Sequence, residues 1–376
     1  MMIDISDLAE MKKVQMSVDI TDDLKREINN KINTDVYEIA SQLKINPTRL
    51  YEYFIWRKST IPLNILMKIS EKFNISKERL HKNIVIYKQR HAPATNSIRN
   101  PKIPIEISPY MTSIVSHLFF DGSVPRDGKG TYYNQKNEKI MDDFIKKLNS
   151  VFGDVSYSLK IDHKGVLKCR MPRLIGEICR NVYGITTSFG TFDARVPKKI
   201  FKMDDDHKQA FVLSAIIDEG SITYDGDIMF GVSNKWMCED VKMLCNQIGL
   251  ETSTVNKKIR KKYYYFRIKS KDGLLKIIDS LSAVCPLISL GYKEERLRHH
   301  FKTKKVPGLR TKKGADQRRK SILELIENEP RTANQLSVEL IIPCRSVKRH
   351  LKYLMKKNII KRKKAKHNNY IYFFPN

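Results

Sequence analysis

The chain has 376 residues, of which 41% are hydrophobic, enough for two or three folded domains. It carries 70 Lys and Arg against 41 Asp and Glu, a formal net charge of +29, and such an excess indicates a polyanionic partner, most often nucleic acid. No apolar run of about 18 residues exists, which argues against a membrane protein.

The first element group is a compact helical unit that begins at Thr21, where a threonine and two aspartates favour a helix start. Helices are predicted at 36–43 and 47–56, joined by a short turn, and a further helix opens at Ile61. This unit resembles the helix-turn-helix of the phage-repressor class, with Ala40 under the turn. The alternative is an ordinary helical bundle. The resemblance implies that the second helix presents to a DNA major groove the residues Asn46, Thr48, Arg49, Glu52 and Tyr53.

Residues 89–109 predict a linker between a first domain, 1–88, and the rest of the chain. Several prolines and asparagines in this stretch disfavour regular structure and impose extended segments. Its cations either follow DNA phosphates or are simply solvated, and the sequence leaves both open: Lys88 at the edge, then Arg90, Arg99 and Lys102.

One pattern then occurs twice, at 114–124 and at 212–222. Each copy is an apolar, helix-compatible run that ends in an acid, a glycine, a serine and a β-branched residue. We expect the glycine to adopt a left-handed cap. The acids, Asp121 and Glu219, fall at the negative end of the helix dipole, which disfavours them. An unfavourable placement that is repeated predicts a cation held between the two acids.

The two hinges belong to a longer internal repeat. Each is followed by a strand-like segment, an amphipathic helix that stops at Gly153 or Gly249, one or two further strands and a short helix. Two αββαββα-like units in tandem predict an α+β domain with pseudo-twofold symmetry over 110–300, with halves at about 110–200 and 204–300.

On these residues the central domain resembles the LAGLIDADG, or DOD-type, homing-endonuclease family, over about half the chain. The resemblance implies that the two hinge helices pack side by side on small residues, Ser116 and Ser214. It also implies that Asp121 and Glu219 meet in a shared metal site above two saddle-shaped sheets that straddle DNA. In that family a lysine near the site orients or activates water, which points to Lys269 in the second half.

Lys168 would be the counterpart of this lysine in the first half. For the metal, Mg²⁺ (or Mn²⁺) suits all-oxygen coordination and leaves positions for water and phosphate oxygens. The acidic run 204–206 also invites a metal interpretation, but we take it as the N-cap of the second hinge helix.

Strands of the central sheets are expected to contact DNA. Alternation in 263–269 places Phe266 and Ile268 in the core and Arg267 outward. Any single lysine is more simply a solvated charge, and only the clustering favours DNA. The candidates are Arg126, Lys129, Tyr132, Asn134 and Gln135 in the first half, and Lys257, Lys258, Arg260, Lys261, Lys262 and Arg267 in the second.

The chain ends with a basic linker, 301–315, and a predicted winged-helix domain, 316–376. The linker is expected to lie along a DNA backbone with steep salt dependence. The winged helix comprises three helices and two wing strands; such domains also bind proteins, but the outward cations favour DNA. The groove-facing and wing residues would be Arg345, Lys348, Arg349, Lys352, Lys363 and Lys364.

Two functions remain. The first is a site-specific, metal-dependent endonuclease that hydrolyses phosphodiester bonds of double-stranded DNA; the second is a catalytically inactive relative that regulates transcription. Two carboxylates close to phosphates favour the first, because a pure DNA clamp gains nothing from them. The flanking modules and an atypical first motif, with His117, Phe119 and Phe120, favour the second. RNA maturation is a weaker third, since major-groove readers suit B-form duplexes.

Cellular setting and assembly complete these expectations. No secretory leader opens the chain, and six cysteines without CxxC spacing are typical of reduced core residues, so a cytoplasmic, nucleoid-associated protein is predicted. No splicing residues flank the chain, which predicts a free-standing protein. Both halves in one chain predict a monomer without a small-molecule substrate.

Overall fold

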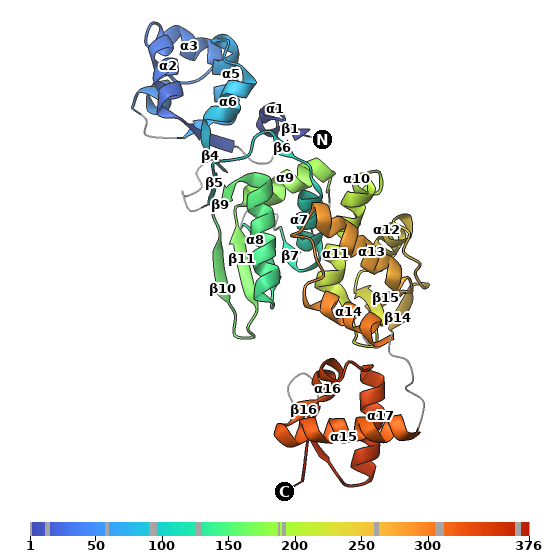
Figure 1. The fold of residues 1–376 in the computed structure, drawn as a ribbon. Coiled ribbons are helices and arrows are strands. Elements are labelled where there is room, and N and C mark those ends of the chain that lie inside the picture. Colours follow the sequence, from blue (N-terminus) through green and yellow to red (C-terminus); the bar gives the residue numbers. More distant parts are fainter. Residues whose placement is uncertain are drawn as a thin grey trace.

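The computed structural model describes residues 2–11, 16–56, 60–89, 96–124, 130–186, 189, 193–258, 263–304, 312–364 and 370–375. It is a mixture of helices and antiparallel sheets in which an N-terminal helical group, a central group and a C-terminal group follow one another along the molecule (Figure 1). One core runs from Ile3 to Leu297, and a second runs from Ile322 to Tyr372. Among the described residues no helix is long and apolar enough to cross a membrane.

The N-terminal group has the helices that the sequence predicts. Thr21 is the N-cap of the first long helix, and Lys44 adopts a left-handed conformation (φ 57°) that ends the second, over the buried Ala40. The elements are β1 (Met2–Ile3), α1 (Ile5–Ala9), β2 (Met16–Ile20), α2 (Asp22–Ile32), α3 (Val36–Leu43), α4 (Pro47–Leu50), the π-helical turn η1 (Tyr51–Ile55), β3 (Ile61–Pro62), α5 (Leu63–Lys72), α6 (Lys77–Asn83) and β4 (Ile84–Gln89).

The segment predicted as an irregular linker contains two strands, so that prediction was wrong for residues 97–99 and 105–106. β5 (Ser97–Arg99) pairs with β4 on one side and with β9 (Asp154–Val155) on the other, in the sheet β3-β2-β4-β5-β9. β6 (Ile105–Glu106) pairs with β1. Pro101 and Pro104 of this segment fall between the two strands and Pro109 falls after them, where no ladder hydrogen bond is lost. Because β9 belongs to the central group, this sheet connects the first two groups.

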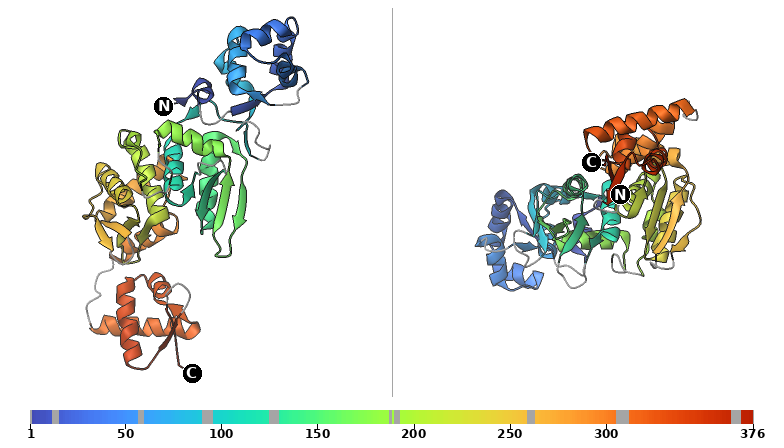
Figure 2. Two further views of the ribbon diagram at one scale, coloured as in Figure 1. Left: turned by 180° about the vertical axis from the view of Figure 1, so that it is seen from behind. Right: turned by 90° about the horizontal axis from the view of Figure 1, so that it is seen from below.

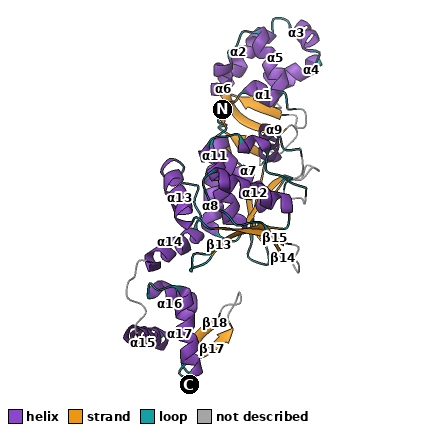
Figure 3. Cartoon of the chain, turned by 90° about the vertical axis from the view of Figure 1, so that its right-hand side faces the viewer, coloured by secondary structure: helices purple, strands orange, loops and turns teal. Residues whose placement is uncertain are grey.

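The central group is the predicted tandem repeat, with two four-stranded antiparallel sheets, β7-β8-β11-β10 and β12-β13-β15-β14. Figure 3 shows α7, α11 and α12 on one side of the second sheet. The elements are α7 (Pro109–Phe120), β7 (Gly122–Ser123), β8 (Thr131–Gln135), α8 (Glu138–Phe152), β10 (Ser158–Ile161), β11 (Leu167–Met171), α9 (Arg173–Tyr183), α10 (Lys198–Phe201), α11 (Asp205–Glu219), β12 (Gly220–Ile222), β13 (Ile228–Val232), α12 (Lys235–Gln247), β14 (Asn256–Lys258), β15 (Tyr263–Ile268), α13 (Lys271–Val284) and α14 (Tyr292–Lys304).

Local signals set these boundaries much as expected. The Asp204 carboxylate accepts a hydrogen bond from the backbone N–H of His207 (3.1 Å), which confirms it as the N-cap of α11. Gly153 and Gly249 adopt positive φ angles (99° and 80°) directly after α8 and the last turn of α12. The six cysteines are free and buried.

The C-terminal group comprises α15 (Lys312–Asn328), β16 (Arg331–Thr332), α16 (Ala333–Glu339), α17 (Cys344–Lys356), β17 (Lys361–Lys364) and β18 (Tyr370–Phe373). The strands form a sheet in the order β16-β18-β17. Because α14 continues to Lys304 and α15 begins at Lys312, the predicted basic linker is helical at both ends.

Among the described residues, Tyr224 packs against the core of the C-terminal group, and polar contacts also join this group to the central group. The Asp225 carboxylate, in the turn between β12 and β13, accepts a hydrogen bond from the backbone N–H of Arg345 in the first turn of α17 (3.0 Å). His299 Nε2 of α14 lies 3.1 Å from the Ser337 hydroxyl of α16. Figure 2 shows this group at the end of the molecule opposite the N-terminal helices.

Candidate active site

The centre of the molecule is the pair of helices α7 and α11. The Ser113 and Ser214 hydroxyls lie 2.6 Å apart, and the Ser116 hydroxyl donates to the carbonyl oxygen of Phe211 (2.8 Å). These serines are buried, and their small side chains let the two helices approach closely. The sequence predicted Ser116 and Ser214 at this contact.

Close helix packing brings the two hinge acids to the same end of the pair. Asp121 is the C-cap of α7, and Glu219 is the last residue of α11. A Cβ at Gly122 would lie 2.5 Å from Leu118 Cα, and one at Gly220 would lie 2.5 Å from the Ile216 carbonyl oxygen. Neither glycine has a positive φ, so the predicted left-handed cap was wrong. The glycines are needed because the strand leaves each helix too closely for a side chain.

The electrostatics of these acids show that they are crowded. Burial, and then the neighbouring Asp218, raise the pKa of Asp121 to about 7. Burial, then Asp121 and Asp218, raise the pKa of Glu219 to about 7. Lys293 acts in the opposite direction on both. The carboxylates are therefore close enough to repel, and a cation is the simplest means of ionising both at neutral pH.

Lys293 is a buried cation at this end of α11 that the sequence analysis missed. Burial lowers its pKa to about 8, although Asp218, Asp121 and Glu219 favour its charged form. It caps the helix, because the last carbonyl groups of a helix lack backbone donors. Its Nζ donates to the carbonyl oxygens of Ile216 (2.9 Å), Ile217 (2.5 Å) and Gly220 (2.7 Å).

Asp218, which precedes Glu219, belongs to a second, buried polar network. Its side chain has no exposed surface and accepts a hydrogen bond from the Tyr133 hydroxyl (2.8 Å) and one from His117 Nδ1 (2.9 Å). Lys147 Nζ lies 2.8 Å from His117 Nε2 and donates to Ser113 Oγ (2.9 Å). Because an ammonium group can only donate, Nε2 accepts and the proton of the neutral imidazole is on Nδ1. His117, one of the residues that make the first motif atypical, thus links α7 to α11 through Asp218.

The lysine pair that the resemblance suggested is not equivalent in the structure. The ladder Gly122–Tyr133–Cys169 in the first sheet matches Gly220–Phe230–Phe266 in the second. Counting along the strands makes Tyr265, and not Lys269, the counterpart of Lys168.

Lys168 and Lys269 also differ in their surroundings. Lys168 pairs across the sheet with Asn134, whose side-chain amide donates to the Asp121 carbonyl oxygen (3.0 Å), so Lys168 is near the first acid. Lys269 is more than half exposed and forms an ion pair with Glu251 (2.9 Å). In the second half, Lys293 is the lysine whose charge acts on both acids.

The outer faces of the two sheets, away from the helices, carry part of the predicted basic surface. In the first sheet, Lys168 and Arg170 lie over the ring of Tyr132, at 4.7 and 5.9 Å from its centroid. In the second, Arg267 is exposed between buried Phe266 and Ile268, as predicted. The outer-face side chains are Tyr132, Asn134, Lys160, Lys168 and Arg170 in the first sheet, and Asn256, Lys258, Tyr263, Tyr265 and Arg267 in the second.

Three residues predicted to contact DNA have other roles. Tyr53 is 4% exposed and belongs to the core of the N-terminal group. Gln135 donates to the Tyr133 hydroxyl (3.2 Å) and accepts from the next two backbone N–H groups. Lys257 pairs with Tyr264, lies 5.7 Å from its ring centroid, and so faces the helix side of the sheet.

The other predicted DNA contacts are either on the surface or outside the described residues. Exposed are Thr48, Arg49, Lys258, Arg345, Lys348, Arg349, Lys352, Lys363 and Lys364, of which Arg49 forms an ion pair with Glu52 (2.6 Å). Outside the described residues lie Arg126, Lys129, Arg260, Lys261 and Lys262.

The donor set at the hinge fits a hard divalent cation only in part. In the portion of the chain that the structure describes, no group of three or more His, Cys, Asp or Glu side chains is placed to hold a metal ion. Asp121 and Glu219 are nevertheless two buried oxygen donors whose pKa values are raised by burial and by neighbouring carboxylates. Mg²⁺ commonly binds to one or two carboxylates and completes its shell with water and phosphate oxygens.

Comparison with solved structures finds partial alignments at low identity. No family model matches the chain, and no curated protein matches its sequence. The homing endonuclease I-DmoI in complex with DNA and Mn aligns at 16% identity over 47% of this chain and 97% of that one, with a TM-score of 0.34. Full-length DUF199/WhiA from Thermatoga maritima aligns at 12% identity over 66% of this chain and 90% of that one, with a TM-score of 0.36. These values are too low to transfer a residue role from either protein.

Proposed function

We propose that this chain binds double-stranded DNA and that its central group is a metal-dependent endonuclease. The observation that carries the proposal is the meeting of Asp121 and Glu219, from two helices of an internal repeat, with their pKa values raised to about 7. Structural acids at helix ends usually face solvent and keep ordinary pKa values. One chain supplies both acids, so a monomer suffices.

In this proposal Asp121 and Glu219 hold Mg²⁺, which would supply Lewis-acid stabilisation of the scissile phosphate and a lowered pKa for water. The residues of the chain position the acids. Asn134 fixes the backbone of Asp121, and Lys293 fixes the end of α11. Lys168 and Arg267 lie on the outer faces of the sheets, where they would neutralise phosphates on either side of the acids.

The flanking groups would extend the recognised sequence. In the N-terminal group, α3, the left-handed turn at Lys44 and α4 have the order of a helix-turn-helix, with Thr48 and Arg49 exposed on the second helix. The C-terminal group has the order helix, strand, helix, helix, strand, strand, which supports a winged helix whose α17 carries Arg345, Arg349 and Lys352 outward.

A second candidate is a DNA-binding transcription regulator without nuclease activity. It is favoured by Lys293, an internal cation that already neutralises part of the charge on the acids. Incubating the chain with a randomised duplex library and Mg²⁺ separates the two candidates. Cuts at a defined sequence support the endonuclease, whereas tight, salt-sensitive binding with intact DNA supports the regulator.

The raised pKa values predict pH-dependent metal binding. Unfolded Asp and Glu ionise near pH 4, so the stability gained by holding protons in the folded site is complete below about pH 4 and is lost as the pH rises through about 7. A divalent cation must displace these protons, so its apparent affinity should fall about tenfold per displaced proton for each pH unit below 7.

Thermal unfolding with and without Mg²⁺, at about pH 5.5 and about pH 8, measures this effect. We expect a clear rise in Tm at the higher pH and almost none at the lower one. The Asp121→Asn variant should show no such difference. An equal rise at both pH values in the native chain would contradict metal binding at these acids.

If the outer faces of the sheets bind DNA, replacing a lysine on an outer face should weaken binding more than replacing one on the helix side. Lys168→Gln removes a cation from the outer face of the first sheet and should reduce the slope of log affinity against log salt by about one unit. Lys257→Gln is the matched control, because Lys257 faces the helix side. Fluorescence anisotropy with a labelled duplex at several salt concentrations measures both. Equal slopes for the two variants would show that the outer face does not contact DNA.

A further inference from the structure

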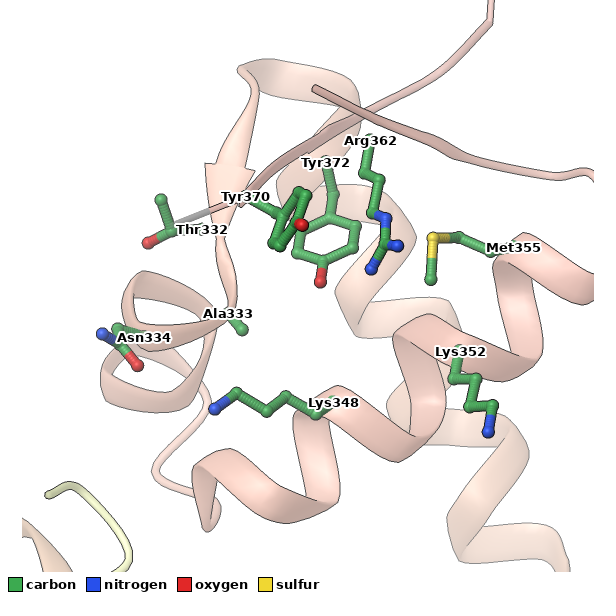
Figure 4. A pocket seen from close by; sticks show the side chains of 9 residues that line it. All are labelled: Thr332, Ala333, Asn334, Lys348, Lys352, Met355, Arg362, Tyr370 and Tyr372. Atoms are coloured by element: carbon green, nitrogen blue, oxygen red, sulfur yellow. The ribbon is translucent and has the colours of Figure 1, made fainter. Parts of the chain in front are cut away.

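A cavity of about 550 Å³ opens in the C-terminal group, between the start of α16, one flank of α17 and the hairpin of β17 and β18 (Figure 4). This volume lies within the usual range for sites that hold a small molecule. It is lined by Thr332, Ala333, Asn334, Lys348, Lys352, Met355, Arg362, Tyr370 and Tyr372.

All the charged side chains that line this cavity are positive. Lys348, Lys352 and Arg362 contribute three cations, and no carboxylate lines the cavity. Two of these cations have neutral partners: Arg362 interacts with the Tyr372 hydroxyl and Lys348 with the Cys344 thiol. Lys348 and Arg362 face the cavity from opposite walls (Figure 4), and an anion with several oxygen acceptors between them would lower the electrostatic free energy of both.

The aromatic side chains of the cavity narrow the class of anion. The Arg362 guanidinium lies 4.3 Å from the ring centroid of Tyr370, and Arg362 pairs across the hairpin with the buried Tyr372. Figure 4 shows the two tyrosine rings and Arg362 together on one wall and Lys348 on the opposite wall. A planar, partly apolar group can stack on such a wall, while its charged end reaches the lysines.

The cavity is not simply the groove-facing side of α17. Val347, Leu351 and Leu354 bury one side of this helix, and Arg345 and Arg349 lie on the opposite, exposed side. Lys348 and Met355 occupy the flank between them, which faces α16 and the hairpin, and Lys352 lies at its edge. A ligand between Met355 and Arg362 would therefore touch residues that a duplex across the exposed side of α17, with Arg345, Arg349 and Lys352, would not need.

We propose that this cavity binds a nucleotide, with the phosphate held by Lys348 and Arg362 and the base stacked at Tyr370. The chemistry is the same for a free nucleotide and for a nucleotide within a DNA strand. The inference depends only on the C-terminal group and does not require nuclease activity in the central group.

The test uses the full chain and its Arg362→Gln variant, with Lys361→Gln as the matched control. Both residues are exposed cations on β17, but strand alternation points Lys361 to the other face, where it pairs with Phe373. In the first arm, AMP is titrated calorimetrically. In the second, a labelled duplex is titrated by anisotropy. We expect Arg362→Gln to weaken binding about tenfold or more in at least one arm and Lys361→Gln to leave it unchanged, with unaltered Tm in both variants.

The two arms identify the source of the nucleotide. Saturable AMP binding that Arg362→Gln abolishes supports a free nucleotide, and a Tyr370→Leu variant should then lose AMP while retaining inorganic phosphate. Weakened duplex binding without AMP binding supports a nucleotide of the DNA strand. If Arg362→Gln and Lys361→Gln behave alike in both arms, the cavity is not a nucleotide site.

Discussion

Replacing Asp121 by Asn is expected to lower Mg²⁺-dependent cleavage by about a thousandfold or more, because the substitution removes one of two metal-holding carboxylates. Glu219→Gln should have an effect of similar size, since the internal repeat places the second acid symmetrically. Both variants are nearly isosteric and should fold. The measurement is the rate of cleavage of the target duplex selected from a randomised library, with and without EDTA.

The outcome for DNA binding separates catalysis from folding. Removing a negative charge near phosphates should leave duplex affinity unchanged or increase it. Asp142→Asn, an exposed acid on α8, is the control and should cleave normally. If the native chain binds DNA with strong salt dependence but never cuts it, and the substitutions only strengthen binding, the endonuclease proposal fails and the regulator remains.

Replacing Lys293 by Met is expected to destabilise the folded chain by about 3–5 kcal/mol, the usual cost of removing one partner from a buried charge cluster. Methionine fills a similar volume, so the loss is electrostatic. The carbonyl groups at the end of α11 lose their donor, and Asp121, Asp218 and Glu219 lose their cation. Urea unfolding followed by circular dichroism measures the free energy.

The matched control for this substitution is Lys302→Met, an exposed lysine on the same helix, which should change stability by less than about 0.5 kcal/mol. A divalent cation should recover part of the loss in Lys293→Met, because it neutralises the same carboxylates. Wild-type stability in the variant would show that the acids carry little charge in the folded chain and need no cation.

The parts of the fold that the sequence predicts are those marked by neighbouring residues, such as helix caps and glycine stops, or by a pattern that occurs twice. The hinge pattern at Asp121 and Glu219 recurs within a matching series of elements, and this recurrence identified the helix pair and the two sheets. The cap at Asp204 and the stops at Gly153 and Gly249 depend on neighbouring residues only. The sheet through β5 was missed, because its strands are two to six residues long and pair across the predicted linker.

In the candidate site, too, the features that the sequence did not predict are contacts between residues far apart in the chain. Lys293 is 76 residues from Ile217, whose carbonyl group it caps, and it lies in a basic stretch where no local feature distinguishes it. The contact of Asp218 with His117 spans 101 residues. Alternation correctly placed Arg267 outward, because its flanking residues are strongly apolar. The clustering of cations could not place Lys257, because it does not tell which face of an edge strand each side chain takes.

The backbone N–H of Arg345, in the first turn of α17, already donates a hydrogen bond to the Asp225 carboxylate of the central group. An anionic partner that needs this N–H must displace a carboxylate that the chain itself provides, so the measured affinity is the intrinsic affinity reduced by the fraction of molecules in which the turn is free. Thermodynamic linkage makes the effect reciprocal: the partner loosens the C-terminal group by the same factor by which the Asp225 contact weakens the partner. The Asp225 carboxylate therefore competes with any anionic partner for this N–H, and because both groups belong to one chain the competition does not depend on protein concentration.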